Sequence, residues 1–221
     1  MIRIASIERL GVSVAAMSDS SDGDASGPDL PSICAALGLD ASSLITVRQV
    51  HGCNVVLADD WAPGPNSVEA DAIIVNQPGT SVAVRVADCV PIWMYTKDLG
   101  IGALVHAGRE GTFRRISEVV VRLLKEQYGA PAESLAVVLG PSAGPCCYEV
   151  SEPMAEDWRI EGLVAAGRHL DLWRSNARQL ESMGIAATNI ELPTVCTICT
   201  TEFHSHRRTG TKERNAAILS I

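Results

Sequence analysis

The sequence lacks long apolar runs, clusters of basic residues and a leader-like N-terminus. Its apolar stretches are strand-sized and interrupted, well short of the roughly 18 residues that a membrane span needs. Basic residues number 18 against 26 acidic ones, and a net charge of −8 argues against binding to a nucleic-acid backbone. Arg3, Glu8 and Arg9 lie where a signal peptide would be apolar. We therefore expect a cytoplasmic protein that binds neither nucleic acid nor membranes.

The composition is that of an ordinary globular protein. The 221 residues are 47% hydrophobic and 20% charged, which is sufficient for a large core. Two segments, residues 18–31 and 62–67, are rich in Ser, Asp, Gly and Pro and are predicted to be loops. Neither divides the chain into halves with separate cores. The prediction is a single domain over residues 1–221.

Apolar periodicity predicts both strands and helices. Short β-branched runs predict strands at residues 44–47, 55–58, 72–75, 81–86, 91–95, 102–106 and 135–139. Apolar residues at helical spacing predict one helix from about Ile116 to Gly129 and a second from about Asp171 to Gly184. This pattern indicates an α+β (mixed α/β) fold, and it leaves the strand order open.

Three potential metal ligands follow predicted strands. His51, Cys89 and His106 each lie where an apolar strand gives way to a loop. One thiolate and two imidazoles are a suitable set for Zn²⁺ and leave a fourth position open for water or substrate. Spacing alone equally allows a buried, hydrogen-bonded histidine and a core cysteine, so both interpretations stay open.

The remaining cysteines allow several interpretations. An odd total of seven, with Cys146 and Cys147 adjacent, is a poor disulfide framework. The surrounding segment, residues 140–148, is compatible with backbone binding of an anion or with a tight connection. Cys196 and Cys199, followed by two histidines, are compatible with a structural zinc clip or a redox pair. The next two residues, Arg207 and Arg208, are compatible with a phosphate clamp or a solvated face.

Taken together, seven motifs occur in a characteristic order. They are Gln49–Gly52 (QVHG), Glu69–Ala72 (EADA), Val86–Pro91 (VADCVP), Val105–Gly108 (VHAG), Leu139–Val150 (LGPSAGPCCYEV), Leu170–Trp173 (LDLW) and Cys196–Arg208, which begins Cys-Thr and ends Ser-His-Arg-Arg. RLGVS at residues 9–13 matches more loosely. This series resembles the YfiH-like family, also called multicopper polyphenol oxidoreductase (laccase-type) or purine nucleoside phosphorylase family, to which FAMIN is related.

The resemblance implies a single layered domain with sheets flanked by helices. It implies a zinc ion held by His51, Cys89 and His106, with copper as the alternative metal. It also implies phosphorolysis of adenosine, inosine, guanosine and methylthioadenosine, together with deamination of adenosine. The expected partners are therefore a small nucleoside and phosphate.

The chain departs from the family pattern at two places. The family usually has Trp-Arg after His-Ala-Gly, whereas this chain has Arg109 and Glu110. If the family arginine contacts phosphate or ribose, Arg109 replaces it only in part. His204 stands where a phenylalanine is common, and it adds a titratable group.

The hypothesis of a metal-dependent nucleoside enzyme assigns roles to individual residues. Cys89, His106 and Asp88 are the predicted catalytic residues, with Asp88 or Glu149 as the proton carrier. Arg48, Gln49, Arg207 and Arg208 are predicted to bind substrate or phosphate, because phosphorolysis needs a cationic cradle.

Three functions other than a nucleoside enzyme make different demands on the sequence. A true laccase needs more histidine ligands than the five in this chain, so the count argues against it. A cysteine or amide hydrolase would use Cys89 as nucleophile and His106 as base, for example in the editing of peptidoglycan precursors. A zinc-stabilised interaction module would bind metal without turnover.

Overall fold

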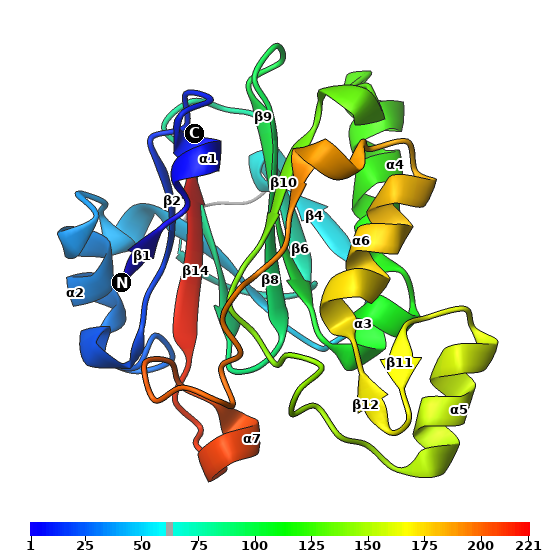
Figure 1. Cartoon of the computed structure of the whole chain (residues 1–221). Coiled ribbons are helices and arrows are strands. Elements are labelled where there is room, and N and C mark those ends of the chain that lie inside the picture. Colours follow the sequence, from blue (N-terminus) through cyan, green and yellow to red (C-terminus); the bar gives the residue numbers. More distant parts are fainter. Residues whose placement is uncertain (61–63) are drawn as a thin grey trace.

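Two six-stranded sheets form the centre of the molecule (Figure 1). The computed structural model describes residues 1–60 and 64–221. The first sheet has the order β1 (Ile2–Arg3), β2 (Val14–Met17), β14 (Asn215–Ser220), β7 (Ser81–Val86), β3 (Leu44–Arg48) and β5 (Gly64–Glu69). The second has the order β13 (Ile190–Glu191), β10 (Ala136–Leu139), β8 (Val90–Thr96), β9 (Ile101–Ala107), β6 (Ala72–Val75) and β4 (Val55–Leu57).

Both sheets mix parallel and antiparallel pairs. In the first, β3 runs parallel to β5 and β7, while β14 is antiparallel to β2 and β7. In the second, β8 and β9 form a long antiparallel hairpin, and β6 is antiparallel to β9. The antiparallel pair β10·β8 and the parallel pairs β4·β6 and β10·β13 complete this sheet. The expected mixed α/β fold class is confirmed.

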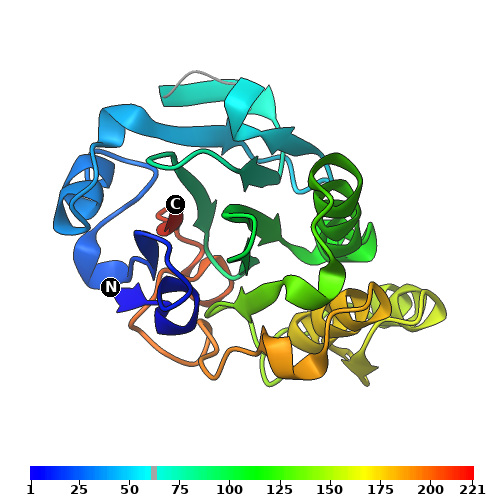
Figure 2. The same cartoon turned by 90° about the horizontal axis from the view of Figure 1, so that it is seen from above.

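The helices in the described part of the chain are α1 (Ala5–Glu8), α2 (Leu30–Ala36), α3 (Arg109–Phe113), α4 (Ile116–Tyr128), α5 (Glu152–Ile160), α6 (Leu172–Ser182) and α7 (His206–Thr209). Of these, α2 packs on the outer face of the first sheet and α4, α5 and α6 on that of the second, whereas Ile7 of α1 lies in the core between the sheets. A small ribbon of β11 (Ala165–Ala166) and β12 (His169–Leu170) lies beside α5. Figure 2 shows α2 on one side of the sheets and α4 with α6 on the other. Among the described residues, no helix is long and apolar enough to span a bilayer.

Three apolar clusters hold these layers together. Trp93 and Leu104 of the second sheet are fully buried against Val84 and Leu219 of the first, so the two sheets share a core. A second cluster packs α4, α5 and α6 on the second sheet, and a third packs α2 on the first. Burial of this apolar surface is the main force that stabilises the layered arrangement.

The seven predicted strands and the two predicted helices are confirmed, with α4 ending at a left-handed Gly129 as expected. The predicted loop at residues 62–67 is wrong in part. Residues 62 and 63 lie outside the described residues, whereas Gly64–Glu69 is strand β5. Because β5 is an edge strand, a proline within it need not remove a hydrogen bond from the sheet.

Candidate active site

The chain segments at the C-terminal ends of β3, β7 and β9 come together in space. Strand β9 leads directly into α3, which lies toward the same end of the molecule as α7 (Figure 1). Here the structure brings His51, Cys89 and His106 together, with one ligand atom of each within 4.8 Å of the others. The two imidazole rings meet edge to face at 4.8 Å between centroids. The predicted convergence of these three residues is therefore present in the fold, although they are separated along the chain.

Each of the three side chains is positioned by its local backbone. His106 belongs to the fully buried strand β9, opposite Pro91 of β8. His51 and Asp88, which directly precedes Cys89, have left-handed backbone with φ of 59° and 86°. This conformation is uncommon for residues other than glycine, and it is concentrated at functional sites. It turns the chain sharply after β3 and β7, so that His51 and Cys89 face His106.

Asp71 fixes the orientation of two of these residues, and no role was predicted for it. Its buried carboxylate accepts hydrogen bonds from the backbone N–H groups of His51 at 2.9 Å and Gly52 at 2.7 Å. It also accepts one from His106 Nδ1 at 2.8 Å. These bonds and the neighbouring imidazole outweigh burial and lower the pKa of Asp71. The bond to Nδ1 leaves Nε2 of His106 available toward Cys89.

The electrostatics of the site favour a thiolate. Burial opposes ionisation of Cys89, but the charges and hydrogen bonds of His106 and His51 outweigh it and lower the pKa of the thiol from 9.0 to about 6. Burial likewise disfavours the imidazolium of His106, yet the Cys89 thiolate and Asp71 raise its pKa from 6.5 to about 9. Thiolate and imidazolium thus stabilise each other between these two values.

The donor set fits a metal ion. A thiolate and two imidazole nitrogens at this separation match the N/S ligation of zinc, and three protein ligands leave one position open. Asp71 serves as the carboxylate partner that metal-binding histidines commonly have. Gly108 leaves the necessary space, because a Cβ there would lie 2.8 Å from Cys89 Sγ and 3.2 Å from His51 Cδ2.

This close approach leads to a prediction. Gly108→Ala is expected to displace Cys89 and His51 and to lower bound metal several-fold, measured by elemental analysis after dialysis. Gly38→Ala is the control, since Gly38 has φ of +74° and no neighbour within 4 Å of the added Cβ. It should lower the Tm through backbone strain and leave the metal content unchanged. Full metal content in Gly108→Ala would contradict this geometry.

A cavity of about 680 Å³ opens above the three residues. This volume is in the range of small-molecule sites. Its described lining includes five arginines, Arg48, Arg85, Arg109, Arg207 and Arg214. Two carboxylates, Asp88 and Glu110, also line it. The cavity is therefore locally cationic in a protein whose net charge is −8, as an anion-binding site requires.

The predicted substrate-binding residues have different surroundings. Arg48 and Arg207 line the cavity, and the Arg207 guanidinium lies 4.9 Å above the centre of the Tyr148 ring. Gln49 lines it too, but its amide is paired with the backbone N–H and C=O of Arg85. Arg208 points away and donates to the backbone carbonyls of residues 197, 200 and 203. Its geometry fits a loop clamp rather than a phosphate ligand.

Of the two predicted proton carriers, Asp88 lines the cavity, whereas Glu149 is not among its described lining residues. The Asp88 carboxylate accepts a hydrogen bond from Thr197 Oγ1 at 2.7 Å and another from the Arg207 backbone N–H at 2.6 Å. Glu149 is exposed and ion-paired with Arg168. Asp88 is thus placed to position Arg207. Proton carriers that line the cavity beside the three clustered residues include Glu110 and His206.

The family departure lies in the cavity wall. Arg109 and Glu110 open helix α3 and both line the cavity. The Glu110 carboxylate accepts a hydrogen bond from Arg114 Nε at 2.7 Å and lies 3.7 Å from Arg109. His204, the other departure, lies close to Gly23 and Glu213 instead. Two arginines therefore offset the negative charge that Glu110 brings to the cavity.

Comparison with known proteins decides the family. A family model described as multi-copper polyphenol oxidoreductase laccase matches residues 27–221. The chain belongs to this YfiH-like family. Crystal structures of YlmD from Geobacillus stearothermophilus and YfiH from Bacillus licheniformis share the fold, with TM-scores of 0.80 and 0.81. YlmD is 25% identical, and the match covers 94% of this chain and 91% of YlmD. YfiH is 24% identical, and the match covers 87% of this chain and 79% of YfiH.

Relatives within the YfiH-like family are named as nucleoside enzymes. A protein from Bacteroides thetaiotaomicron named purine nucleoside phosphorylase is 30% identical, over 76% of this chain and 69% of the relative. Adenosine deaminase RL5, from an unknown prokaryotic organism, is 34% identical, over 79% of this chain and 73% of the relative. These names support an enzyme, as expected from the sequence.

Proposed function

We propose that the chain is a metal-dependent purine nucleoside phosphorylase that also deaminates adenosine. The observation that carries the proposal is the convergence of His51, Cys89 and His106 below a cationic cavity of about 680 Å³. A nucleoside and a phosphate ion together match this volume and charge. The proposed substrates are adenosine, inosine, guanosine and methylthioadenosine.

His51, Cys89 and His106 are the proposed metal ligands, and zinc is the proposed metal. A bound zinc ion supplies Lewis acidity, which lowers the pKa of water toward ~7 and polarises a substrate oxygen or nitrogen. Asp71 holds His106 in the tautomer that offers Nε2. The chain has five histidines, so a set of laccase copper centres is not proposed despite the family description.

Phosphorolysis places the charge of the reaction near the arginines. An oxygen of hydrogen phosphate attacks C1′ of the ribose, the bond from C1′ to the purine N9 breaks, and the purine leaves with the proton that the phosphate gives up. The products are ribose 1-phosphate and the free base. Arg48 and Arg207 are proposed to bind phosphate, which concentrates it and opposes its repulsion by Glu110.

Deamination uses the same nucleoside pocket without phosphate. Water adds to C6 of adenosine, and ammonia leaves with the proton that the water supplies. The products are inosine and ammonia. Glu110 and His206 are the residues proposed to move this proton, since both line the cavity.

The phosphate role of Arg207 is testable by substitution. Charge-assisted hydrogen bonds contribute about 1.5–3 kcal/mol, so Arg207→Gln is expected to raise the KM for phosphate roughly 10- to 100-fold. Phosphate-independent deamination should change far less. Arg208→Gln serves as the matched comparison and should mainly lower the Tm, because its guanidinium holds backbone carbonyls. An unchanged KM for phosphate in Arg207→Gln would remove Arg207 from the phosphate site.

Two assays test the proposal itself. Inosine with phosphate should yield hypoxanthine and ribose 1-phosphate, and adenosine without phosphate should yield inosine and ammonia, both resolved by chromatography. The Glu110→Arg variant, which restores the family arginine, should retain or increase phosphorolysis. Absence of all these products from metal-loaded protein would contradict the proposal.

The second candidate is a cysteine or amide hydrolase. It is favoured by the lowered pKa of Cys89 and by the order Cys89, His106, Asp71, which resembles a nucleophile, a base and an orienting carboxylate. Hydrolysis of peptidoglycan precursors is the example to assay. A non-catalytic zinc-stabilised module is the outcome left if neither class of substrate is turned over.

The alkylation rate separates a metal ligand from a free nucleophile. In metal-depleted protein, Cys89 is expected to react with iodoacetamide with a midpoint near pH 6, because its thiolate persists down to that pH. An ordinary thiol would titrate near 9. Zinc should protect Cys89 if it is a ligand. Equal alkylation with and without zinc would favour the hydrolase.

A further inference from the structure

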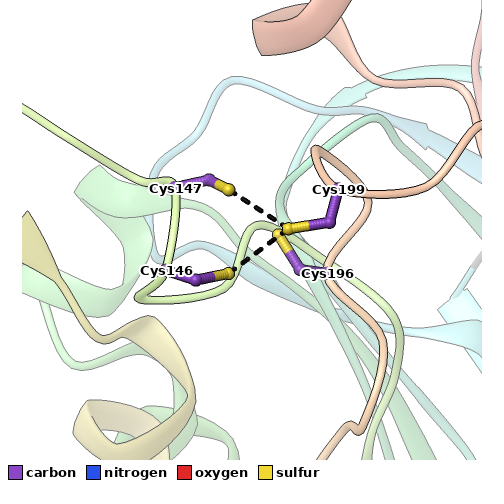
Figure 3. Close-up of side chains that lie close together, drawn as sticks. All are labelled: Cys146, Cys147, Cys196 and Cys199. Carbon is purple, nitrogen blue, oxygen red and sulfur yellow. Dashed lines mark hydrogen bonds between the residues drawn. The ribbon is translucent and has the colours of Figure 1, made fainter.

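Four cysteines from two distant segments converge on one point, away from the candidate active site. Cys146 and Cys147 follow β10, and Cys196 and Cys199 lie between β13 and α7 (Figure 3). Their four sulfur atoms all lie within 4.8 Å of one another. Cys199 Sγ is 3.5 Å from the Cys146 sulfur and 3.2 Å from the Cys147 sulfur.

We propose that these four cysteines form a structural zinc site, separate from His51, Cys89 and His106. Zinc bound tetrahedrally by four thiolates at ~2.3 Å separates the sulfurs by ~3.8 Å, close to the separations of Cys199 from its two neighbours. A disulfide needs ~2.05 Å and uses one partner, whereas Cys199 faces two sulfurs at similar distances. Four protein ligands close the coordination sphere, as in structural sites.

Backbone hydrogen bonds join the two segments that carry the cysteines and support one of the thiols. A parallel bridge joins Ser142 to Cys196, with the Thr197 N–H donating to the Ser142 carbonyl at 3.0 Å. The Gly144 N–H donates to Cys196 Sγ at 3.2 Å, a bond that stabilises a thiolate ligand. Gly144 permits this approach, because a Cβ there would lie 3.1 Å from Cys196 Cβ.

Each pair of ligands is presented by a tight turn. The Cys147 N–H donates to the Gly144 carbonyl, and the Cys199 N–H donates to the Cys196 carbonyl, both at 3.1 Å. The turns aim two sulfurs from each segment at the shared centre. The predicted clip through Cys196 and Cys199 is thus completed by the adjacent pair Cys146 and Cys147, while His204 and His206 bond elsewhere.

The site would join two walls of the cavity. Tyr148 directly follows the first pair, and Arg207, which lies over the Tyr148 ring, belongs to the segment that carries the second pair. Thr197, within that segment, donates to Asp88 next to Cys89. A metal at the four cysteines therefore braces Arg207 and Asp88. Its existence does not depend on which reaction the cavity performs.

Metal counting tests the proposal. Protein made with zinc under reducing conditions is expected to hold two zinc ions per chain by elemental analysis and native mass spectrometry. Cys89→Ala should hold one, Cys146→Ser/Cys199→Ser should hold one, and the triple variant none. Cys34→Ser and Cys53→Ser are controls that should keep two, since neither residue belongs to a candidate cluster.

The Cys89→Ala protein gives a readout that does not depend on activity or on the stability of the double variant. X-ray absorption at the zinc edge should show four sulfur neighbours at ~2.3 Å. The four thiols should resist alkylation until a chelator is added. Zinc-free Cys89→Ala protein with four reactive thiols, or with a disulfide among them after anaerobic purification, would overturn the proposal.

Discussion

Cys89→Ala is expected to lose both the metal that we propose to bind near His51 and His106 and the proposed nucleoside chemistry. The thiolate is the one anionic donor of the set, and its pKa of about 6 keeps it ionised at neutral pH. Lewis-acid stabilisation is worth several kcal/mol, so kcat/KM for inosine phosphorolysis should fall roughly 1,000-fold or more. The measurement is product formation by protein whose metal content is known.

The controls for this variant separate loss of chemistry from loss of fold. Cys34→Ala removes a buried sulfur from the inner face of α2, and it should lower the Tm somewhat while activity persists. Cys89→Ala should keep a cooperative unfolding transition, because Cys89 is only half-buried at the cavity floor. A Cys89→Ala protein that turns over inosine at the normal rate without metal at this site would refute the assignment of the ligand.

Asp71→Asn is expected to weaken the site without removing a ligand. Asn donates through its NH₂ group, so it cannot reproduce all the hydrogen bonds that Asp71 accepts from the 50–52 backbone and His106. Substitution of such carboxylate partners lowers metal affinity or activity about 10- to 100-fold. Competition with a chelator measures the metal affinity, and assays of zinc-saturated protein measure the effect on turnover that remains once metal is bound.

A pH profile distinguishes this positioning role from general destabilisation. Loss of the Asp71 charge removes one cause of the raised His106 pKa, so the metal-free imidazolium should titrate below about 9 in the variant. NMR of the His106 ring reports that change. Asp98→Asn, an exposed hairpin substitution, should alter neither affinity nor titration. If Asp71→Asn lowered the Tm alone, its role would be only structural.

The strands that the sequence predicted are those with β-branched residues, such as β7 and β3. The missed strands β2 and β14 contain two alanines each, and alanine has little preference for strands. These two segments form strands because of their tertiary contacts, since β14 lies buried between β2 and β7. Helix α2 was missed because it begins at Leu30, inside a segment whose Ser, Asp, Gly and Pro content predicted a loop. The proline in its first turn is a residue that a helix tolerates at this position.

The sequence predicted the site residues that lie at the ends of apolar strands, and it missed the role of the residue whose position depends on strand pairing. His51, Cys89 and His106 each follow an apolar run, so their residue types and positions were informative. Asp71 belongs to a motif that was noticed, but its role requires β6 to pair beside β9, which places it next to His106. The meeting of Cys147 with Cys199 depends likewise on the bridge between Ser142 and Cys196.

The central claim is that metal held by His51, Cys89 and His106 carries the nucleoside chemistry. The most direct test is to follow adenosine with and without phosphate in the same protein before metal removal, after removal and after zinc is restored. We predict phosphate-dependent adenine and phosphate-independent inosine only from the zinc-containing samples, with copper as a comparison. Equal turnover by metal-free protein carrying the free Cys89 thiolate would contradict the claim.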